Sequence, residues 1–366
     1  MGKYKMKRII IISELVGGGV EKVNRLLAEN LNHEKYDILF VSIRGIEISN
    51  KYNLNFKYIS LNCSKQSKAF FKILKVFSEF SPDIIITCGS YDTYFSILYS
   101  RLIQKSCKSI YVHHSVYSTN LVKKRGFKKI IHHYIPKLIN LYNMFDKVVS
   151  VSYGAKDDLL EYFKIDKEKI TVIYNPIIDE NIKIKRIGNR LESNSLITIG
   201  RVEEEKDQLT ILKAIKYLID RGEEYYLKIL GEGSLKKKLM QASEDMGIQN
   251  YVEFLGYKDD IYYELSKSDI FILSSKHESF GNVIIEAMYS EVPVISTDCL
   301  YGPKEIIKND EYGILFHIGD YEGLAEKILF LNNIDKSNLI NNAKNYSLKF
   351  TVNNSVKEYQ KLLDLL

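Results

Sequence analysis

Several residue types and patterns are scarce or missing in this chain of 366 residues. Tryptophan is absent, and the four cysteines, Cys63, Cys88, Cys107 and Cys299, are far apart and form no Cys-x-x-Cys pair. Their spacing therefore indicates neither a disulfide framework nor a zinc site. No Asp-x-Asp pair occurs, which excludes a magnesium-binding carboxylate pair of that kind.

Long apolar runs are also missing. None approaches the roughly 20 residues that a membrane-spanning helix needs. A basic stretch up to Arg8 is followed by only four apolar residues, Ile9 to Ile12, and so short a run is not the apolar region of a signal peptide. We interpret it as a first buried strand and expect a cytoplasmic protein.

What is present is the composition of an ordinary globular protein. Hydrophobic residues make up 45% and charged residues 27%, which excludes intrinsic disorder, collagen and coiled-coil fibres. The length predicts two domains. The charge is uneven, because residues 1–175 carry 28 Lys and Arg against 15 Asp and Glu, a net +13, and residues 176–366 carry 24 against 31, a net −7. A basic half suits nucleic acid, an anionic membrane or a phosphorylated substrate; the alternative is two solvated surfaces without partners.

Short Ile- and Val-rich runs alternate with helical patterns along the whole chain. The runs are apolar on both faces, which is typical of parallel strands covered by helices on both sides. The candidate strands of the first half are 8–13, 38–42, 58–61, 83–87, 109–112, 147–151 and 169–174. Those of the second half are 195–199, 226–230, 252–255, 270–274, 292–296 and 313–316.

The strand series restarts near Leu196, which predicts an α/β fold of two doubly wound parallel-sheet domains. We place the first domain at 1–178 with the last helix, 350–366, a linker at 179–189 and the second domain at 190–349. Ligands of such sheets bind outside the carboxyl ends of the strands. We therefore expect the site in a cleft where the two domains face each other.

A glycine-rich loop, Gly17-Gly18-Gly19, lies between the first strand and a helix predicted over 22–31. Glycine lets a backbone approach a ligand closely, and a helix start suits phosphate. The spacing is not that of a dinucleotide fingerprint, and a plain tight turn is the alternative.

Two cations follow the first strand of the second half. Arg201 leaves the strand and Lys206 opens the next helix, with three glutamates between them. Together they could hold a diphosphate through charge-assisted hydrogen bonds. The alternative is surface pairing with those glutamates.

The most informative motif is Ser274-Ser-Lys-His-Glu-Ser-Phe-Gly-Asn-Val283, which links a buried strand to a helix. Glu278 lies in the loop, and Glu286 lies two helical turns further on, near the helix entrance. A carboxylate there can accept hydrogen bonds from ribose hydroxyls, and the N–H groups of residues 281–283 can bind phosphate oxygens. Helix capping and solvent contact are the alternative roles.

Two further features carry weaker signals. His113 and His114 follow a strand and could contact a phosphate or a sugar hydroxyl, or move a proton; histidines without a role are the alternative. In the basic segment 122–145 we predict a helical apolar stripe from Phe127 to Phe145, kinked by Pro136, which could lie on an anionic membrane or pack in the core.

Taken together and in order, these motifs resemble glycosyltransferase family 4, the retaining nucleotide-sugar transferases of GT-B fold. The resemblance extends over nearly the whole chain. It includes the glycine-rich loop, Ile199-Gly-Arg-Val202, Lys206, Leu230-Gly-Glu-Gly233, Leu255-Gly-Tyr257 and the Glu-x7-Glu pair. The motifs Pro293-Val-Ile-Ser-Thr-Asp-Cys299 and Gly302-Pro-Lys-Glu305 resemble a bacterial subgroup that builds lipid-linked or surface polysaccharides.

The resemblance implies roles for individual residues of the second half. Arg201 and Lys206 match the pair that binds the donor diphosphate and stabilises the departing nucleotide. Glu278 matches the glutamate that contacts the donor sugar, and Glu286 the one that binds the ribose. The loop whose amides hold sugar hydroxyls and phosphate corresponds to Ser279, Phe280, Gly281, Asn282 and Val283. Ser279 stands where glycine is frequent and narrows the expected sugar pocket.

For the first half, the resemblance implies that Gly18 and Gly19 close over the phosphates. It also implies a cleft histidine near the transferred sugar, which matches His114 rather than His113, although the order Val-His-His-Ser leaves both open. The final helix is expected to cross back to the first domain.

The activity implied is metal-independent transfer of a hexose or N-acetylhexosamine from a nucleotide-diphosphate sugar, uridine favoured, to a hydroxyl of a glycan or polyprenyl-diphosphate-linked acceptor. No cofactor and no nucleic-acid partner are expected. We expect contact with the inner face of the plasma membrane through 122–145. The alternatives are a GT-B epimerase or hydrolase acting on nucleotide sugars, and a catalytically silent partner subunit.

Overall fold

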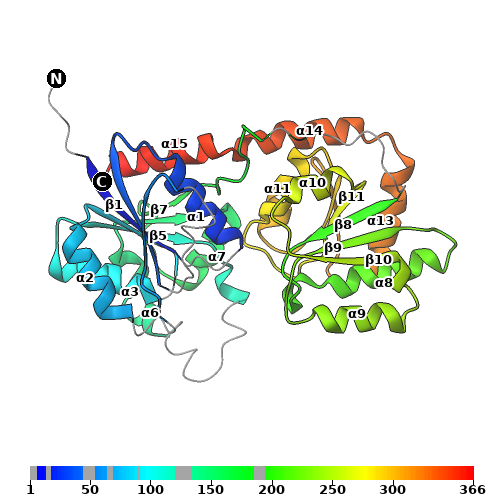
Figure 1. Ribbon diagram of the computed structural model, residues 1–366, viewed down its shortest axis with the longest axis horizontal. Helices are drawn as coiled ribbons and strands as arrows, with labels where there is room; N and C mark the ends of the chain where they lie inside the picture. The colour runs from blue at the N-terminus through cyan, green and yellow to red at the C-terminus, as the bar shows by residue number, and fades with distance from the viewer. Residues whose placement is uncertain are drawn as a thin grey trace. The chain divides into compact units, whose positions relative to one another are not determined.

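The protein consists of two compact units (Figure 1). The computed structural model describes residues 6–13, 18–43, 54–63, 69–89, 91–119, 134–182, 184 and 194–366. One unit comprises Met1–Pro176 and Val352–Leu366, and the other comprises Ile177–Thr351. Of the predicted linker at 179–189, only residues 179–182 and 184 lie in the described part.

The first unit is built on a seven-stranded sheet in which every pair of neighbours is parallel. The strands are β1 (Lys7–Ile12), β2 (Tyr36–Ser42), β3 (Lys57–Ser60), β4 (Ile84–Thr87), β5 (Lys108–His113), β6 (Lys147–Ser150) and β7 (Ile170–Val172). Their spatial order is β3-β2-β1-β4-β5-β6-β7. Each predicted apolar run of the first half forms one of these strands.

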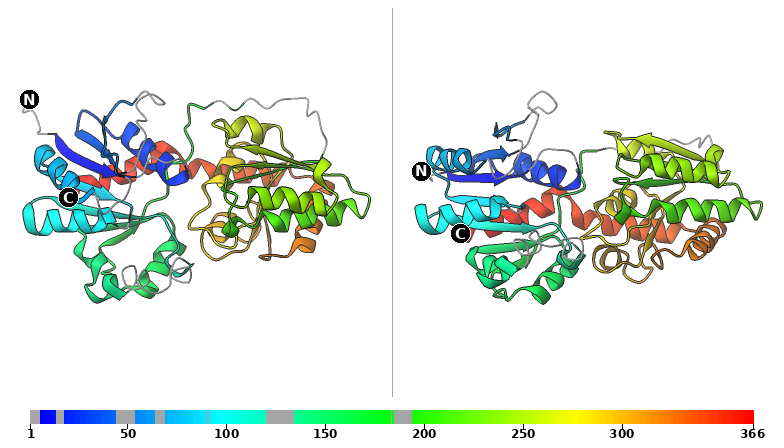
Figure 2. Two further views of the ribbon diagram at one scale, coloured as in Figure 1. Left: turned by 60° about the horizontal axis from the view of Figure 1, so that its bottom comes forward. Right: turned by 90° about the horizontal axis from the view of Figure 1, so that it is seen from below.

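Helices cover both faces of this sheet (Figure 2). They are α1 (Gly19–Asn30), α2 (Phe70–Phe80), α3 (Tyr91–Leu98) with a π-helical turn (Tyr99–Ile103), α6 (Ile135–Leu138), a 3₁₀ turn (Leu141–Met144), α7 (Tyr153–Tyr162) and α15 (Val352–Asp364). Ile10 and Ile12 of β1 pack with Ile73 and Phe77 of α2. Because side chains alternate along a strand, Ile9 and Ile11 face the other side, where they are also buried.

The predicted helical stripe over 127–145 is wrong in its described part. Helix α6 ends at Leu138, and Asn140 adopts a left-handed conformation with φ 51°. This turn sends Leu141, Tyr142 and Phe145 into the core around β6, whereas Leu138 stays 86% exposed. Residues 120–133 lie outside the described part.

The second unit contains a six-stranded parallel sheet. Its strands are β8 (Ser195–Ile199), β9 (Tyr226–Leu230), β10 (Val252–Gly256), β11 (Ile270–Leu273), β12 (Val294–Thr297) and β13 (Ile314–Phe316). Their order is β10-β9-β8-β11-β12-β13. Each predicted run of the second half forms a strand, which confirms the predicted class of two doubly wound parallel sheets.

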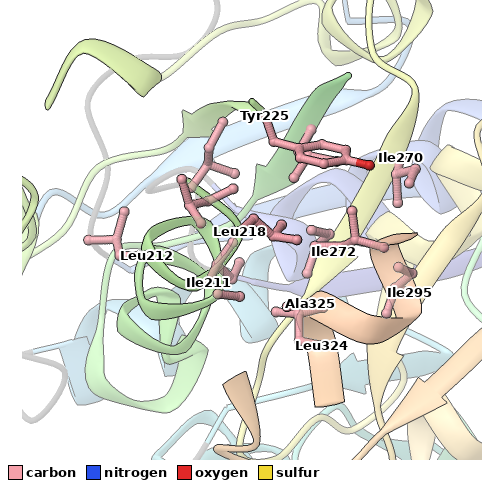
Figure 3. Packing of buried hydrophobic residues seen from close by; sticks show 14 of the residues in the cluster. Ile211, Leu212, Leu218, Tyr225, Ile270, Ile272, Ile295, Leu324 and Ala325 are labelled. Carbon is pink, nitrogen blue, oxygen red and sulfur yellow. The ribbon is translucent and has the colours of Figure 1, made fainter. Parts of the chain in front are cut away.

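The helical elements of the second unit surround this sheet. They are a 3₁₀ turn (Glu204–Lys206), α8 (Gln208–Ile219), α9 (Lys236–Asp245), a 3₁₀ turn (Gln249–Tyr251), α10 (Ile261–Ser266), α11 (Asn282–Tyr289), α12 (Gly302–Ile307), α13 (Tyr321–Asn333), α14 (Ser337–Ser347) and a 3₁₀ turn (Leu348–Phe350). On one face, Ile211 and Leu218 of α8 meet Leu324 of α13 over Ile272 and Ile295 of the sheet (Figure 3). Burial of such side chains stabilises the unit by about 25 cal/mol per Å² of apolar surface.

The last helix, α15, belongs to the first unit although it follows the second in sequence. It packs against α1 and buries the stripe Val356, Tyr359, Leu362 and Leu363. This confirms the helix predicted for the last residues. No helix in the described ranges is long and apolar enough to cross a membrane.

The strand orders locate one special position in each sheet. The order reverses between β1 and β4 in the first sheet and between β8 and β11 in the second. At such a point the loops leaving the two strands diverge to opposite faces, and ligands of doubly wound proteins bind there. The predicted site residues of the second unit follow β8 and β11.

Candidate functional site

The reversal point of the second sheet brings together two segments that are distant in sequence. The loop after β8 runs from Gly200 to Lys206, and the loop after β11 runs from Ser274 to Gly281. The Lys276 N–H donates to the Glu205 carbonyl at 2.8 Å, and the Ser274 hydroxyl donates to the Lys206 carbonyl at 2.7 Å. These bonds hold the loops side by side.

At the centre of this site lies an ion pair between Lys206 Nζ and Glu278 Oε1. The side chains are 18% and 13% exposed. Glu278 Oε1 also accepts a hydrogen bond from Ser275 Oγ at 2.7 Å. The structure therefore places two of the predicted residues in direct contact, in surroundings that screen their charges less than bulk water does.

Arg201 is placed differently. Its guanidinium binds Glu205 Oε1 at 2.8 Å, and its side chain is 70% exposed. Pairing with one of the intervening glutamates was the alternative that the sequence left open. In this structure it is found for Arg201 but not for Lys206, which pairs with Glu278. A pair so exposed is weak, typically about 0–1 kcal/mol, so an anion of higher charge can compete for Arg201.

The second predicted glutamate lies inside helix α11. Gly281 precedes this helix in a left-handed conformation, φ 98°, and Glu286 follows within it, 5% exposed. Tyr262 of α10 lies nearby: burial, and secondly the charge of Glu286, raise the pKa of its phenol. The carboxylate is thus largely withdrawn from solvent.

The side chains of the loop between the two glutamates differ in burial. Phe280 is buried, with its ring 5.4 Å from that of Phe350, so it anchors the loop in the core. Ser279, Asn282 and Val283 are half-buried. A backbone bridge from Glu278 to Tyr301 holds the other end of the loop.

The glycine motifs of the second half form the rim of the same sheet edge. A Cβ on Gly231 would lie 1.9 Å from the Gly200 carbonyl oxygen, and one on Gly233 would lie 2.1 Å from that of Val202. Only glycine lets these backbones approach so closely. These two motifs, 31 residues apart in sequence, are adjacent because β8 and β9 are neighbours in the sheet.

In the first unit, Gly18 and Gly19 form the start of α1. Gly18 has φ 120° and is exposed, and Gly19 is the first helical residue. Gly17 lies outside the described residues. Asn24 of α1 is buried and donates to Ser13 Oγ at 3.0 Å, which fixes the helix beside the end of β1. The helix begins three residues before the predicted start.

The two histidines stand at the carboxyl end of β5. His113, its last residue, is 1% exposed, and His114 is half-buried. Burial lowers the pKa of His113 to about 4; burial and the neighbouring His113 lower that of His114 to about 3. Both rings are therefore neutral at pH 7. Both ring nitrogens of His113, and Nε2 of His114, have no hydrogen-bond partner in the described part of the chain.

Three buried side chains next to the ion pair had no role predicted from the sequence: Ser275, Thr297 and Cys299. Each is 0% exposed. Burial raises the pKa of the Cys299 thiol to about 12, so it is protonated at neutral pH. The available signal was a run of polar residues directly after β11 and another at the end of β12.

Comparisons with known proteins agree with this architecture. The family model described as Glycosyltransferase Family 4 matches residues 17–181, and that described as Glycosyl transferases group 1 matches 179–346. Together they extend over nearly the whole chain, which therefore belongs to glycosyltransferase family 4.

Two relatives come from Campylobacter jejuni. One is an N-acetylgalactosamine-N,N'-diacetylbacillosaminyl-diphospho-undecaprenol 4-alpha-N-acetylgalactosaminyltransferase, 28% identical over 58% of this chain and 57% of its own length. The other is a GalNAc-alpha-(1->4)-GalNAc-alpha-(1->3)-diNAcBac-PP-undecaprenol alpha-1,4-N-acetyl-D-galactosaminyltransferase, 26% identical over 98% of both chains. The chain thus spans less than two thirds of the first relative and nearly all of the second.

Among solved structures, Anabaena Alr3699/HepE in complex with UDP and glucose superimposes with a TM-score of 0.83 at 19% identity. The match extends over 99% of this chain and 100% of that one. The fold is accordingly the GT-B fold, as the resemblance implied.

Proposed function

We propose that the protein is a retaining glycosyltransferase. It transfers a hexose or N-acetylhexosamine, with a UDP-sugar as the favoured donor, to a hydroxyl of a lipid-linked or polysaccharide acceptor in bacterial glycan assembly. The observation that carries the proposal is the Lys206–Glu278 ion pair at the strand-order reversal of the second sheet. A cation that meets a departing diphosphate and a carboxylate that meets a sugar are thereby side by side.

The chemistry requires neutralisation of the leaving group. When the bond between the anomeric carbon and the phosphate oxygen breaks, the sugar becomes positively charged and the diphosphate gains negative charge. Lys206 is fixed close to that charge, and Arg201 reaches it by exchanging Glu205 for phosphate oxygens. Such prearranged cations stabilise the transition state more than the ground state.

The carboxylates bind the neutral parts of the donor. Glu278 accepts hydrogen bonds from sugar hydroxyls near the reacting carbon, and Glu286 accepts them from the ribose. Main-chain amides of residues 279–283 hold phosphate and sugar oxygens at the start of α11. In the first unit, neutral His114 donates a hydrogen bond to a sugar or phosphate oxygen, and Gly18 and Gly19 approach the phosphates.

The anomeric configuration is retained because the acceptor attacks the same face of the sugar from which the diphosphate leaves. The acceptor oxygen bonds to the anomeric carbon on that face, and the departing phosphate oxygen takes the acceptor proton. No protein base is then needed, so we assign none. We also propose that no metal is needed, because Lys206 and Arg201 supply the positive charge and the sequence contains no Asp-x-Asp pair.

Two observations support the proposal that the first unit serves a lipid-linked acceptor: its charge and the substrates of the relatives. Residues 1–175 carry a net +13, and both Campylobacter relatives act on undecaprenol-linked substrates. Segment 122–145 is proposed to touch an anionic membrane on its cytoplasmic side, and its described part exposes Leu138 and Lys137. Sedimentation with phosphatidylglycerol vesicles at low salt tests this contact. Absence of binding, or unchanged vesicle-dependent activity after charge reversal at Lys123, Lys124, Lys128 and Lys129, would refute it.

The activity is tested with a panel of UDP- and GDP-sugars, each with and without a polyprenyl-diphosphate-linked oligosaccharide. We expect thermal stabilisation by one donor, about 2.7 kcal/mol at 100 times its Kd, and acceptor-dependent formation of an α-linked product in the presence of EDTA. A new nucleotide sugar without acceptor would indicate an epimerase. Free sugar would indicate a hydrolase, and no turnover of any donor would indicate a silent subunit.

A further inference from the structure

Three hydroxyl side chains are packed beneath the Lys206–Glu278 ion pair. Ser274 and Ser275 directly follow β11, and Thr297 ends the neighbouring strand β12. They are 1%, 0% and 0% exposed. A hydroxyl withdrawn so fully from water loses free energy unless it is hydrogen-bonded, so the partners of these three groups are informative.

Each hydroxyl holds a different part of the site. Ser275 Oγ donates to Glu278 Oε1 at 2.7 Å, the same oxygen that pairs with Lys206. Thr297 Oγ1 donates to the carbonyl of Ser275 at 2.6 Å. Ser274 Oγ donates to the carbonyl of Lys206 at 2.7 Å. The carboxylate, the backbone below it and the backbone of the lysine are thus all tied to the ends of two adjacent buried strands.

The need for such support follows from the location of Glu278. Its side chain has several rotatable bonds and begins in a loop, where residues 276–279 are half-buried or exposed. An ion pair alone fixes the distance between two flexible side chains but not their direction. A second donor on the same oxygen, attached to rigid strand-end backbone, removes that freedom.

We propose that Ser275 is a positioning residue for glycosyl transfer, and that Thr297 and Ser274 keep it and Lys206 in register. Ser275 directs the Glu278 carboxylate toward the position of the donor sugar while Lys206 stays available to the diphosphate. The inference rests on the proposed function, because it assigns a task to the same ion pair.

The first test compares Ser275→Ala and Ser275→Cys with the control Ser296→Ala. Ser296 is equally buried and donates a hydrogen bond to a carbonyl next to it on β12, but no hydrogen bond joins it to Glu278. We expect Ser275→Ala to lower kcat about 10- to 100-fold, the range for loss of one hydrogen bond to a charged group. The KM for donor and the Kd for UDP should change less than about three-fold. Ser275→Cys, a weaker donor of similar size, should lie between Ala and wild type.

Equal kcat values for Ser275→Ala and Ser296→Ala would overturn the proposal. So would a loss in Ser275→Ala that appears only in KM or follows a fall in Tm. Thr297→Val should lower kcat by part of the loss seen in Ser275→Ala. Thr297→Ser should keep kcat near the wild-type value, because the serine retains the hydroxyl.

The second test does not depend on turnover. A crystal structure of Ser275→Ala or Ser275→Cys should show the Glu278 carboxylate in a new direction, with the Lys206 contact lengthened. If the Glu278 carboxylate kept its direction in these variants, Ser275 would not be a positioning residue, whatever the effect on kcat. Conversely, if the wild-type protein turned over no donor but Glu278 moved in the Ser275 variant, the proposed function would be contradicted. The structural role of Ser275 would remain.

Discussion

The carboxyl ends of the two sheets differ in chemistry although their strand orders are alike. In the second unit the loops after β8 and β11 carry two ion pairs, Lys206–Glu278 and Arg201–Glu205. In the first unit the end of β5 carries His113 and His114, which are neutral because burial lowers their pKa values to about 4 and about 3. One sheet edge is therefore built for charge and the other for neutral hydrogen bonding.

This contrast shows that a doubly wound sheet supplies a location rather than a reaction. In the second unit the reversal of strand order brings the loops after β8 and β11 together, and in both units the residue types at the carboxyl ends of the strands decide what can be bound. A charged edge suits a departing diphosphate, whereas neutral imidazoles can bind oxygen atoms without opposing a positively charged sugar.

The largest expected effect comes from removing the fixed cation. Lys206→Ala should lower kcat about 10²- to 10³-fold, comparable to the loss of one donor to a developing anion. It also removes the cation that pairs with the Glu278 carboxylate. Initial rates of UDP release measure the effect. Lys216→Ala, which removes a lysine of α8 that pairs with Asp220 just after the helix, is the control. Equal rates for the two variants would contradict the role of Lys206.

Close backbone packing gives the next largest effect. In Gly231→Ala the new Cβ would lie 1.9 Å from a backbone oxygen, whereas in Gly89→Ala it would lie 2.2 Å from a side-chain oxygen, Asp92 Oδ1. A side chain can rotate away and a strand end is less able to do so. We expect a loss of about 1–3 kcal/mol in the free energy of unfolding for Gly231→Ala and less for Gly89→Ala. Urea unfolding measures both; Gly247→Ala, with no atom within 4 Å of the new Cβ, controls for strain at positive φ.

The histidines predict an acid-dependent stability. Unfolded His113 has a pKa near 6.5 and folded His113 one of about 4, so between these values the unfolded state binds more protons. The free energy of unfolding should therefore fall as the pH drops from about 6.5 toward 4, by at most about 1.4 kcal/mol per pH unit for each histidine. His113→Gln should flatten this slope, which urea unfolding at a series of pH values measures. Equal slopes for His113→Gln and wild type would show that the imidazole is charged or solvated.

The smallest stability effect is expected for Arg201. Its pair with Glu205 is exposed, so Arg201→Ala should change the free energy of unfolding by only about 0–0.5 kcal/mol. The same variant should weaken UDP binding roughly ten-fold through the lost charge-assisted hydrogen bonds. Calorimetric titration with UDP separates the two effects. Arg221→Ala removes an exposed arginine paired with Glu326 and should leave the affinity for UDP unchanged.

The fold was predictable because most strands are short runs rich in Ile and Val. The site was predictable only in part. Lys206 and Glu278 were both identified, yet they are 72 residues apart, and only the adjacency of β8 and β11 makes them partners. Ser275 went unassigned because a serine after a strand has many uses, and its bond to Glu278 depends on the path of the loop. The stripe at 127–145 failed because local sequence periodicity does not reveal the left-handed turn at Asn140.

The return of α15 makes the first unit discontinuous, with the whole second unit inserted between residues 176 and 352. Lys7 binds the Leu363 carbonyl at 2.8 Å, and Tyr36 donates to Asp364 at 2.6 Å. On the ribosome, therefore, the amino-terminal half waits for residues 352–364, which are translated after the whole inserted half, while the inserted half can already have folded. A stop codon ahead of Val352 would spare the inserted half and strip α1 of its covering helix.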